Sequence, residues 1–530
     1  MRFYRRSYGS RVYSDDYPFV VLYEDDWDDF RFKTTFGVEV WLGKDDVASL
    51  GEVKILDLNQ PPEGGKVRIP EEFTTLGSQF VSLGQAYTYY ETVQSLGAGV
   101  YESFLVGLQD VIYLSQQRSA AEQHRGYQVS LLRNGSAVRA LQDSPKLFFH
   151  GSDYGVRELT NLSFRFVSQV GGSEFEIDFD FGGSKYLPNR LNAIIGYNGV
   201  GKTTLLANLA IVSSADQSER EKELHRERHG FFPGNEDLAF GSTIAISYSA
   251  FDTFELPGRT QDEQARVKKR GELFGYAYCG LRKVEIEPWR PRAIEKRAHT
   301  VVRRTTSLKN SNEISEEFQS ALARSHKDSV RRGILQLALD TLSLEPSFSK
   351  VALRVFTQNE STTDDILREL DRLSTGHKIV LNIVVQLIAH LQERSLVLID
   401  EPESHLHPPL LAALLRSVTV ALQQRDSFGV IATHSPVVLQ EIPRQFVRVL
   451  ERYGELTRVS LPENETFGEN VGFLTRDVFN LDSSQTDYHR VLDSLAQRFP
   501  LEEIEDMFGG RMSSQARAYV VGRIRGRKQT

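Results

Sequence analysis

Gly196-Tyr197-Asn198-Gly199-Val200-Gly201-Lys202-Thr203-Thr204 is the stretch that decides the fold. It follows an apolar run, residues 191–195, and it opens a run of helix formers, residues 205–211. A strand, a glycine-rich turn and a helix in this order predict a phosphate-binding loop. The glycines let consecutive backbone N–H groups curl round a phosphate, and the helix N-terminus adds partial positive charge.

Two side chains give the loop its chemistry. Lys202 offers a mobile cation to the outer phosphates of a nucleotide, and Thr203 offers a hydroxyl to Mg²⁺. A glycine-rich turn that binds nothing is the alternative, and the Lys-Thr pair with both flanks in place argues against it. We therefore predict an ATP and Mg²⁺ site whose phosphate contacts come from Asn198, Gly199, Gly201, Lys202, Thr203 and Thr204.

Composition bounds the class of protein. The chain has 530 residues, enough for several domains with a large core, and its net charge of −8 argues against a surface coated by nucleic acid. The lone cysteine, Cys279, excludes internal disulfides and is expected to be a packed core thiol. No run approaches the ~20 apolar residues of a membrane span. The N-terminus lacks the apolar segment of a signal peptide, so we expect a cytoplasmic protein with no membrane partner.

Residues 1–150 precede the phosphate-binding loop and predict an α+β domain with an aromatic-rich face. Strands are expected at 18–23, 36–41 and 51–56, and a helix at 98–114. No pattern in this domain points to a function. It contains an acidic run that allows a metal or partner site, although a solvated loop is favoured because no other ligand has suitable spacing: Glu24, Asp25, Asp26, Asp28 and Asp29.

Residues 151–256 form the first part of the predicted ATPase unit. The runs 163–167 and 175–181 alternate cleanly and predict an antiparallel pair with one solvated face. Residues 216–229 are densely charged and are expected to be an exposed helix or a disordered excursion, and residues 243–248 are expected to be a strand.

A mostly helical insertion is predicted at 257–350. Its basic residues could hold a phosphate backbone, or they could belong to a solvated helical surface on which nearby acids offset their charge, and both interpretations stay open. The basic residues are Arg282, Lys283, Arg290, Arg292, Lys296, Arg297, Arg303, Arg304, Arg324, Lys327, Arg331 and Arg332.

Two buried strands are expected to deliver the remaining catalytic groups. Residues 396–401 are a continuous apolar run that ends in Asp400 and Glu401, and ligands bind at the carboxyl edge of such parallel strands. Asp400 is placed to reach Mg²⁺, and Glu401 is placed to orient and polarise the attacking water. Residues 428–435 deliver His434, which can hydrogen-bond the γ-phosphate or that water.

A second phosphate-binding helix start is predicted at Ser374 and Gly376. They precede a very apolar helix, residues 379–391, and a Ser-x-Gly turn exposes N–H groups at a helix N-terminus. Because one helix N-terminus already serves the phosphates, this second one is expected to face the nucleotide of another subunit.

The order of these motifs resembles the ABC-type ATPase heads of the SMC, RecF and OLD group. Residues 400–408, Asp-Glu-Pro-Glu-Ser-His-Leu-His-Pro, are especially similar to the OLD-like and Septu-type branch of prokaryotic defence systems. The resemblance covers about 155–465 without the insertion. It implies an α/β P-loop fold with a mixed sheet and two heads that sandwich ATP. It also implies Lys202 and Thr203 on phosphate and Mg²⁺, Asp400 as the second magnesium contact, Glu401 as general base, His434 as γ-phosphate sensor, and Ser374 with Gly376 acting in trans.

The sequence departs from the family at several positions. The glutamine expected after the strand at 243–248 is missing, and Ser249 or Asp252 occupies that region, which puts the outer magnesium contact in doubt. His377 and Lys378 replace the usual end of the transporter signature. His405 and His407 fall in the subunit-contact loop, where a helix entry is favoured over a metal pair.

Three functions compete. The favoured one is an ATPase that dimerises around ATP and gates a partner effector nuclease in antiviral defence. A RecF- or SMC-like repair ATPase that clamps DNA is the alternative, and an ABC transporter subunit has least support. Residues 351–465 complete the ATPase unit, and residues 466–530 are expected to be helical with a basic tail that touches nucleic acid or a partner, or is simply solvated. They contain no Asp-x-Asp of a fused nuclease, so cutting would come from a partner.

Overall fold

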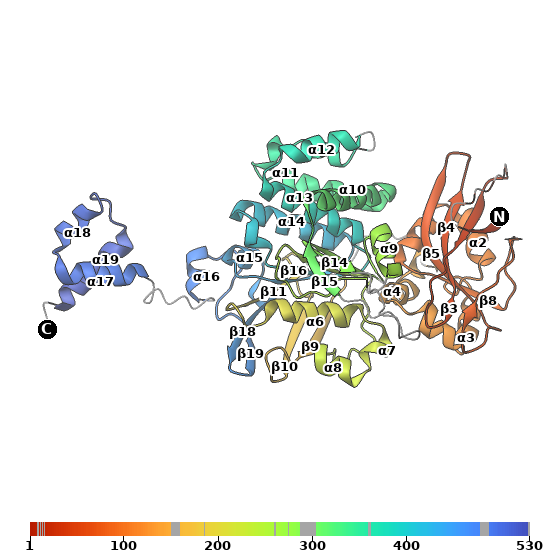
Figure 1. The fold of residues 1–530 in the computed structure, drawn as a ribbon, viewed down its shortest axis with the longest axis horizontal. Coiled ribbons are helices and arrows are strands. Elements are labelled where there is room, and N and C mark those ends of the chain that lie inside the picture. The colour runs from red at the N-terminus through yellow and green to blue at the C-terminus, as the bar shows by residue number, and fades with distance from the viewer. Residues whose placement is uncertain are drawn as a thin grey trace, which may run out of the picture.

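A seven-stranded sheet forms the centre of the computed structural model (Figure 1). The structure describes residues 1–149 except 8, 9, 11, 13 and 15, then 159–258 except 185, 261–286 except 274, 304–358, 362–477 and 487–527. The strand order is β13-β12-β16-β17-β11-β18-β19, parallel except for the hairpin partner β19. The strands are β11 (Leu191–Gly196), β12 (Thr243–Ser247), β13 (Tyr276–Gly280), β16 (Leu396–Asp400), β17 (Phe428–Ala432), β18 (Val447–Tyr453) and β19 (Leu456–Ser460).

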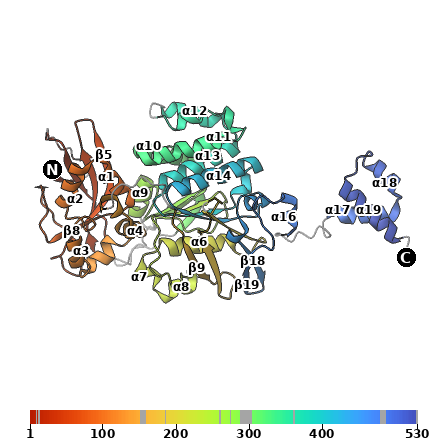
Figure 2. The same ribbon diagram turned by 180° about the vertical axis from the view of Figure 1, so that it is seen from behind.

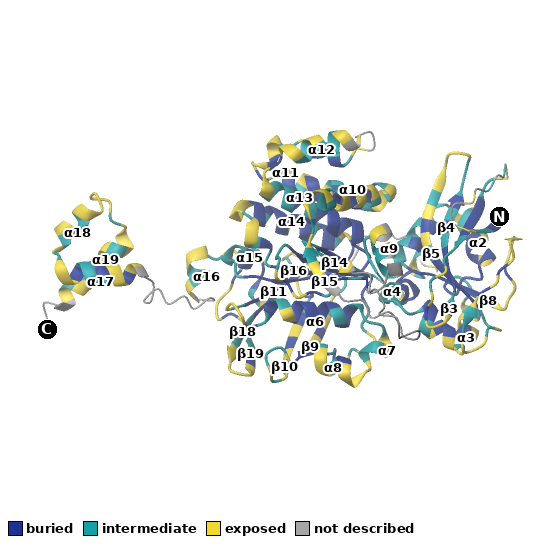
Figure 3. Ribbon diagram, viewed as in Figure 1, coloured by how far each residue is buried: buried dark blue, intermediate teal, exposed yellow. Residues whose placement is uncertain are grey.

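Helices cover both faces of this sheet, and the central strands are buried (Figure 3). Successive side chains point to opposite faces: Ile399 packs towards one helical layer, and Leu398 towards the other. This architecture confirms the predicted α/β P-loop fold with a mixed sheet. One layer holds α10 (Ser311–Lys327), α11 (Ser329–Ser343), α13 (Thr375–His390) and α14 (Pro408–Gln424); the other holds α6 (Lys202–Ser214) with the hairpin β9 (Ser163–Ser168) and β10 (Phe175–Asp180).

The β9–β10 hairpin has the predicted antiparallel pairing and a single solvated face. Phe175, Ile177 and Phe179 are buried, while Glu176 and Asp178 between them are exposed. The charged stretch that follows α6 forms two short helices, α7 (Gln217–Arg220) and α8 (Glu223–His229).

A second sheet lies in the N-terminal part, with the order β7-β1-β2-β4-β5-β8 and helices packed on one face. The helix expected at 98–114 ends early, at Gly107, because Gln109 takes a left-handed conformation with φ 55°. The elements are β1 (Arg2–Ser7), β2 (Phe19–Glu24), β3 (Phe32–Lys33), β4 (Thr35–Trp41), β5 (Val47–Asp57), β6 (Gly65–Lys66), β7 (Glu72–Phe73), β8 (Phe80–Gly84), α1 (Tyr87–Ser95), α2 (Ala98–Gly107), α3 (Ser115–Ala121), a π-helical turn (Tyr127–Leu131), α4 (Gly135–Asp143) and α5 (Lys146–Phe149).

Ion pairs join the N-terminal part to the turns that precede β16 and β17. The Arg425 guanidinium, almost fully buried before β17, lies 2.6 Å from Glu91 of α1. Arg394, before β16, lies 3.5 Å from Asp143 of α4. The N-terminal part therefore contacts the starts of the two strands whose other ends carry the predicted catalytic groups.

The part predicted to be a mostly helical insertion, 257–350, holds the helices α10 and α11 and also three strands that carry no strong signal in the sequence. Residues 276–280 are β13, which pairs with β12 at the edge of the central sheet, and β14 (Arg282–Ile286) pairs with β15 (Arg304–Leu308). Each of these strands is only five residues long and therefore gives little periodic signal, and pairing with a neighbour supplies the missing stabilisation. Helix α9 (Gln261–Arg270) precedes them. Of the basic residues named above, Arg290, Arg292, Lys296, Arg297 and Arg303 lie outside the described residues.

The C-terminal part is helical where it is described. Helices α17, α18 and α19 pack on one another around a small apolar core (Figure 2). No helix within the described ranges is both long and apolar enough to cross a bilayer. The remaining elements are α12 (Thr363–Arg372), α15 (Pro436–Gln440), α16 (Val471–Asp477), α17 (Asp487–Arg498), α18 (Leu501–Met507), α19 (Ser514–Arg527) and 3-10 turns at Phe348–Lys350, Leu353–Phe356, Pro402–His405 and Arg444–Phe446.

The acidic run of the N-terminal part is only partly solvated, which corrects the expectation of a solvated loop. Asp29 is fully buried, with Lys54 Nζ 2.7 Å and Arg133 Nη1 2.6 Å from its carboxylate. Burial opposes ionisation of Asp29, but these two cations outweigh it and hold its pKa below the usual range. Cations fill the position that a metal would need, so Asp29 is a structural carboxylate. Cys279 is a buried free thiol, as predicted.

We expect Asp29→Asn to destabilise the N-terminal sheet by about 3–5 kcal/mol, because Lys54 would stay buried opposite a neutral amide. Asp26→Asn is the matched control: Asp26 is exposed beside Lys66, so its loss should change stability by less than about 1 kcal/mol. Hydrogen exchange of the β5 amides measures the stability of the N-terminal sheet in both variants. Equal effects of the two substitutions would contradict the buried-network account.

Candidate active site

The phosphate-binding loop joins β11 to α6 in the predicted order. Gly201 caps the helix in a left-handed conformation, φ 102°, which favours glycine, and a Cβ there would lie 2.4 Å from Val170 Cγ1. At Gly196, with φ 157°, a Cβ would lie 2.4 Å from the Leu450 carbonyl oxygen. Asn198, Gly199 and Thr204 are exposed on the loop. The loop thus has the backbone shape that a phosphate cradle needs.

Strand order brings the other predicted groups to this loop. Strand β17 lies between β11 and β16, with Ala432 opposite Asp400 in register. The residues that follow β16 and β17, Glu401 and His434, therefore emerge side by side at the carboxyl edge of the sheet.

Lys202, His434 and Glu401 converge. The His434 Nε2 atom lies 2.6 Å from Lys202 Nζ and 3.3 Å from Glu401 Oε1. One imidazole nitrogen cannot accept from Lys202 and donate to Glu401 at once, so the shorter contact favours acceptance from Lys202. Burial lowers the pKa of Lys202 to about 8 against the attraction of nearby acids. Proximity to the His434 ring and to the Lys202 cation lowers the pKa of Glu401.

Thr203 and Asp400 form a donor set that fits Mg²⁺. Thr203 Oγ1 lies 3.0 Å from each carboxylate oxygen of Asp400. Burial raises the pKa of Asp400 to about 7, only partly offset by this hydrogen bond. A buried carboxylate facing a hydroxyl is a hard oxygen site that a divalent cation would stabilise in its ionised form. The residues therefore fit an Mg²⁺–nucleotide complex.

Ser374 and Gly376 do not contact this cluster within the described residues. Ser374 is exposed at the N-cap of α13, where its hydroxyl lies 2.6 Å from His377 Nδ1. Gly376 lies against Leu410 and the 402–405 turn. Ser374 is thus exposed, as a contact with another subunit requires, while Gly376 is half-buried, and the contact stays a prediction.

An ion-paired aspartate occupies the region in which the family has its glutamine. Asp252 is buried, accepts from Tyr278 Oη at 2.7 Å, and is ion-paired with Arg282. Its charge still helps to raise the pKa of Asp400. His405 and His407 are exposed, and no group of three or more metal-binding side chains occurs in the described part of the chain.

The sequence analysis missed Glu403. Its Oε1 atom accepts from the His434 backbone N–H at 2.6 Å and from Thr433 Oγ1 at 2.8 Å, while Oε2 is buried without a partner among the described residues. Glu403 thereby fixes the turn that carries His434. An acid two residues after Glu401, on the same turn, is the signal that was available.

Arg452 was also missed. It lies next to the last residue of β18, and its Nη1 atom lies 3.5 Å from the Gly199 carbonyl oxygen. No local pattern marks it, because its place beside the loop depends on the pairing of β18 with β11.

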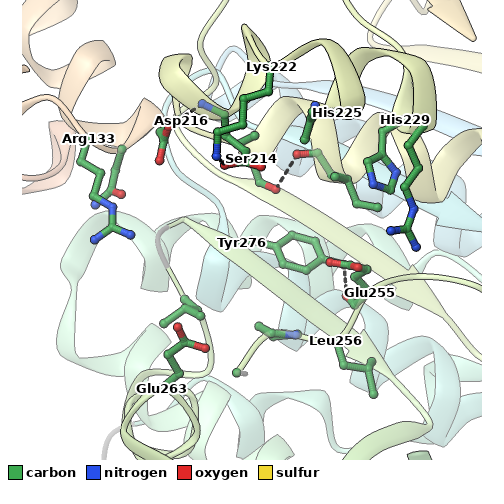
Figure 4. Close-up of a pocket in the computed structure, with 18 of the residues that line it drawn as sticks. Arg133, Ser214, Asp216, Lys222, His225, His229, Glu255, Leu256, Glu263 and Tyr276 are labelled. Carbon is green, nitrogen blue, oxygen red and sulfur yellow. Dashed lines mark hydrogen bonds and ion pairs between the residues drawn. The ribbon is translucent and has the colours of Figure 1, made fainter. Parts of the chain in front are cut away.

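A separate cavity lies at the other end of α6, between this helix, α8, the loop at 255–258 and the N-terminal part (Figure 4). Its volume is about 730 Å³, and acids and bases both line it, including Asp216, Lys222 and Glu263. It contains none of the predicted site residues.

Comparisons with known proteins show a domain family and a phage relative. Residues 278–440 match an AAA domain family whose description adds a suggested AbiEii toxin and a Type IV TA system. Protein ea59 of Escherichia phage lambda is 30% identical over 537 residues, covering 96% of this chain and 95% of that protein.

Solved structures add a weak likeness. An ATP-binding cassette of an ABC transporter in its ADP conformation is 14% identical, with a TM-score of 0.28, and covers 60% of this chain and 96% of that one. The SmcHead bound to the C-winged helix domain of ScpA is 11% identical, with a TM-score of 0.23. The match covers 57% of this chain and 97% of that one. Scores this low do not establish a common fold. The fold assignment rests on the strand order and the loop geometry.

We expect Glu403→Ala to lower ATP turnover about 10- to 100-fold, because the turn of His434 loses a charge-assisted acceptor. ATP affinity should change less than about twofold, since Glu403 does not contact the loop. Glu403→Gln keeps an acceptor oxygen and should recover most of the rate. Steady-state turnover and equilibrium ATP binding separate the two effects, and an Ala variant with normal turnover would contradict this role.

Proposed function

The chain belongs to the same family as protein ea59 of Escherichia phage lambda, and from its site we propose that it is an ATP-dependent switch. In this proposal the chain binds ATP with Mg²⁺, pairs with a second copy round the nucleotide, and hydrolyses ATP to ADP and phosphate. Pairing and hydrolysis would control an effector nuclease on another chain, in the manner of OLD-like and Septu-type defence ATPases.

The convergence of Lys202, His434 and Glu401 beside the Thr203–Asp400 pair carries the hydrolytic part of the proposal. ATP with Mg²⁺, when bound, supplies the activated phosphate. Lys202 would hold the outer phosphates, and Thr203 with Asp400 would hold the cation. Glu401 would accept the proton of the attacking water, with the lowered pKa keeping it ionised, and His434 would hydrogen-bond the γ-phosphate.

The pairing part of the proposal rests on Ser374. Its exposed position places the N-terminus of α13 at the surface, and such a helix start binds anions. The phosphate-binding loop of the same chain is already served by α6, so a second copy is the natural acceptor of this turn.

The effector part has two supports. The family description that matches residues 278–440 names a toxin, which agrees with a role in controlling a harmful activity. Residues 440–530 contain no Asp-x-Asp that could chelate the metal of a fused nuclease, so the effector would be a separate chain.

DNA clamping is less well supported as an alternative. Several cations that would hold a phosphate backbone are already paired: Lys283 with Glu313, Arg517 with Glu505 and Arg523 with Asp493. DNA stays a possible partner through the remaining basic residues of the insertion and the tail.

We expect Glu401→Gln to bind ATP normally, to lose about 100- to 10,000-fold in turnover, and to accumulate as a dimer, because the base is gone and the nucleotide persists. Lys202→Ala should abolish ATP binding and with it the dimer. Glu316→Gln, an exposed glutamate on α10, is the matched control. Sedimentation and phosphate release measure these outcomes, and normal turnover by the Glu401→Gln protein would contradict the assigned role.

The effector is tested separately through the neighbouring reading frame. Its product should copurify with the Glu401→Gln dimer in the presence of ATP and should cleave nucleic acid. Replication genes in that place would favour the DNA-clamping alternative, and a membrane protein would favour transport.

A further inference from the structure

Ser374 is the first member of a chain of hydrogen bonds at the start of α13. Its hydroxyl lies 2.6 Å from His377 Nδ1, and His377 Nε2 lies 2.9 Å from the hydroxyl of Ser347. The Ser347 hydroxyl in turn donates to the Glu345 carboxylate. The His377 ring packs edge-on against Phe348, with the ring centres 4.5 Å apart, so its orientation is fixed.

The protons in this chain point one way. Because Ser347 uses its proton on Glu345, its oxygen is left to accept from His377 Nε2–H. A neutral imidazole that donates through Nε2 carries no proton on Nδ1, so Nδ1 accepts from the Ser374 hydroxyl. The Ser374 proton is therefore directed to His377 of the same protomer and away from any ligand.

Glu345 is an ionised end of the chain. Burial opposes its ionisation, but the Ser347 hydroxyl, the N–H groups of Ser347 and Phe348 and the nearby His377 ring together lower the pKa of Glu345. A fixed negative charge at this end stabilises a proton added at the other end of the relay.

We propose that His377 is a positioning residue for the trans phosphate contact, and that it takes up one proton when Ser374 engages a phosphate of the second copy. The proton comes from solvent and binds Nδ1. Nδ1–H then donates to the Ser374 oxygen, and the Ser374 hydroxyl is free to donate to a phosphate oxygen. No covalent bond changes. The inference rests on the proposed function, because it needs ATP held between two copies.

Charges from each neighbouring element bear on this protonation. Glu345 favours it from the loop before the 348–350 turn, and Lys350 lies on that turn. Lys378, next to His377 on α13, is 4.0 Å from Asp371 of α12, so the two offset one another. The 402–405 turn packs on Gly376 and brings exposed His405 to this side. An incoming phosphate would add negative charge and strengthen proton uptake.

The consequence is a dimerisation constant that depends on pH. Histidine side chains titrate between about pH 5 and 8. If one proton is bound per engaged site, the dimerisation constant should rise by up to about 100-fold per pH unit as pH falls, because a dimer has two sites. The dimerisation constant stops rising at a pH low enough to protonate His377 in the monomer. It does not change with pH where His377 stays neutral even in the dimer.

The test measures this pH dependence in the Glu401→Gln background with saturating Mg²⁺ and ATP. Sedimentation from pH 6 to 8.5 should give a steeper profile for the parent than for His377→Asn, since asparagine accepts from Ser374 but cannot be protonated. Groups near the loop that titrate in the same range, Asp400 and Lys202, are present in both proteins, so the difference isolates His377.

Two serines in one loop give a matched pair. Ser347→Ala breaks the link to Glu345 and should move the midpoint of the profile to lower pH. Ser349→Ala should leave it unchanged, because Ser349 donates only to the Pro346 carbonyl. A purely structural histidine would weaken the dimer equally at every pH. Parallel profiles for the parent and His377→Asn would overturn the inference and leave the proposed function standing, whereas no ATP-dependent dimer in the parent would overturn both.

Discussion

The active site depends on one topological constraint, the insertion of β17 between β11 and β16. Adjacent parallel strands are about 4.8 Å apart, so groups on β11 and β16 lie about two strand spacings from one another. His434, at the end of the middle strand, bridges that distance and contacts both Lys202 and Glu401. The lysine belongs to the loop after β11, and Glu401 follows β16. A strand order without β17 between them would leave the lysine and the glutamate without this common neighbour.

The same edge of the sheet holds charges that the protein alone does not fully compensate. Asp400 is buried against a neutral hydroxyl, and Lys202 is buried between backbone carbonyls and an imidazole. Burial moves the pKa of each towards neutrality, to about 7 for Asp400 and about 8 for Lys202. A cation and a phosphate would restore the ionised forms of both. At the amino ends of β16 and β17, ion pairs with the N-terminal part hold the turns that lead into these two strands.

How far the sequence predicts this arrangement depends on how local each signal is. Lys202 and Thr203 lie in a contiguous motif, and Asp400 and Glu401 end an unmistakable buried strand, so their proximity followed from parallel topology alone. Glu403 was missed because its partner, the His434 backbone, is distant in sequence. Asp29 looked solvated inside an acidic run, since nothing local indicates that Lys54 and Arg133 would close over it. Strands β13 to β15 were missed because strands of five residues show little periodicity and become stable only through their neighbours.

The account's central claim is that the catalytic site closes only when a second copy supplies Ser374. Mixing two inactive proteins tests it directly: Lys202→Ala cannot bind ATP but keeps Ser374, and Ser374→Arg keeps the loop but blocks the trans contact. The account predicts little turnover from either alone and restored turnover on mixing, up to about half of a wild-type dimer per mixed dimer, because such a dimer holds one complete site instead of two. Full activity of Ser374→Arg by itself, or no recovery on mixing while mixed dimers form, would contradict it.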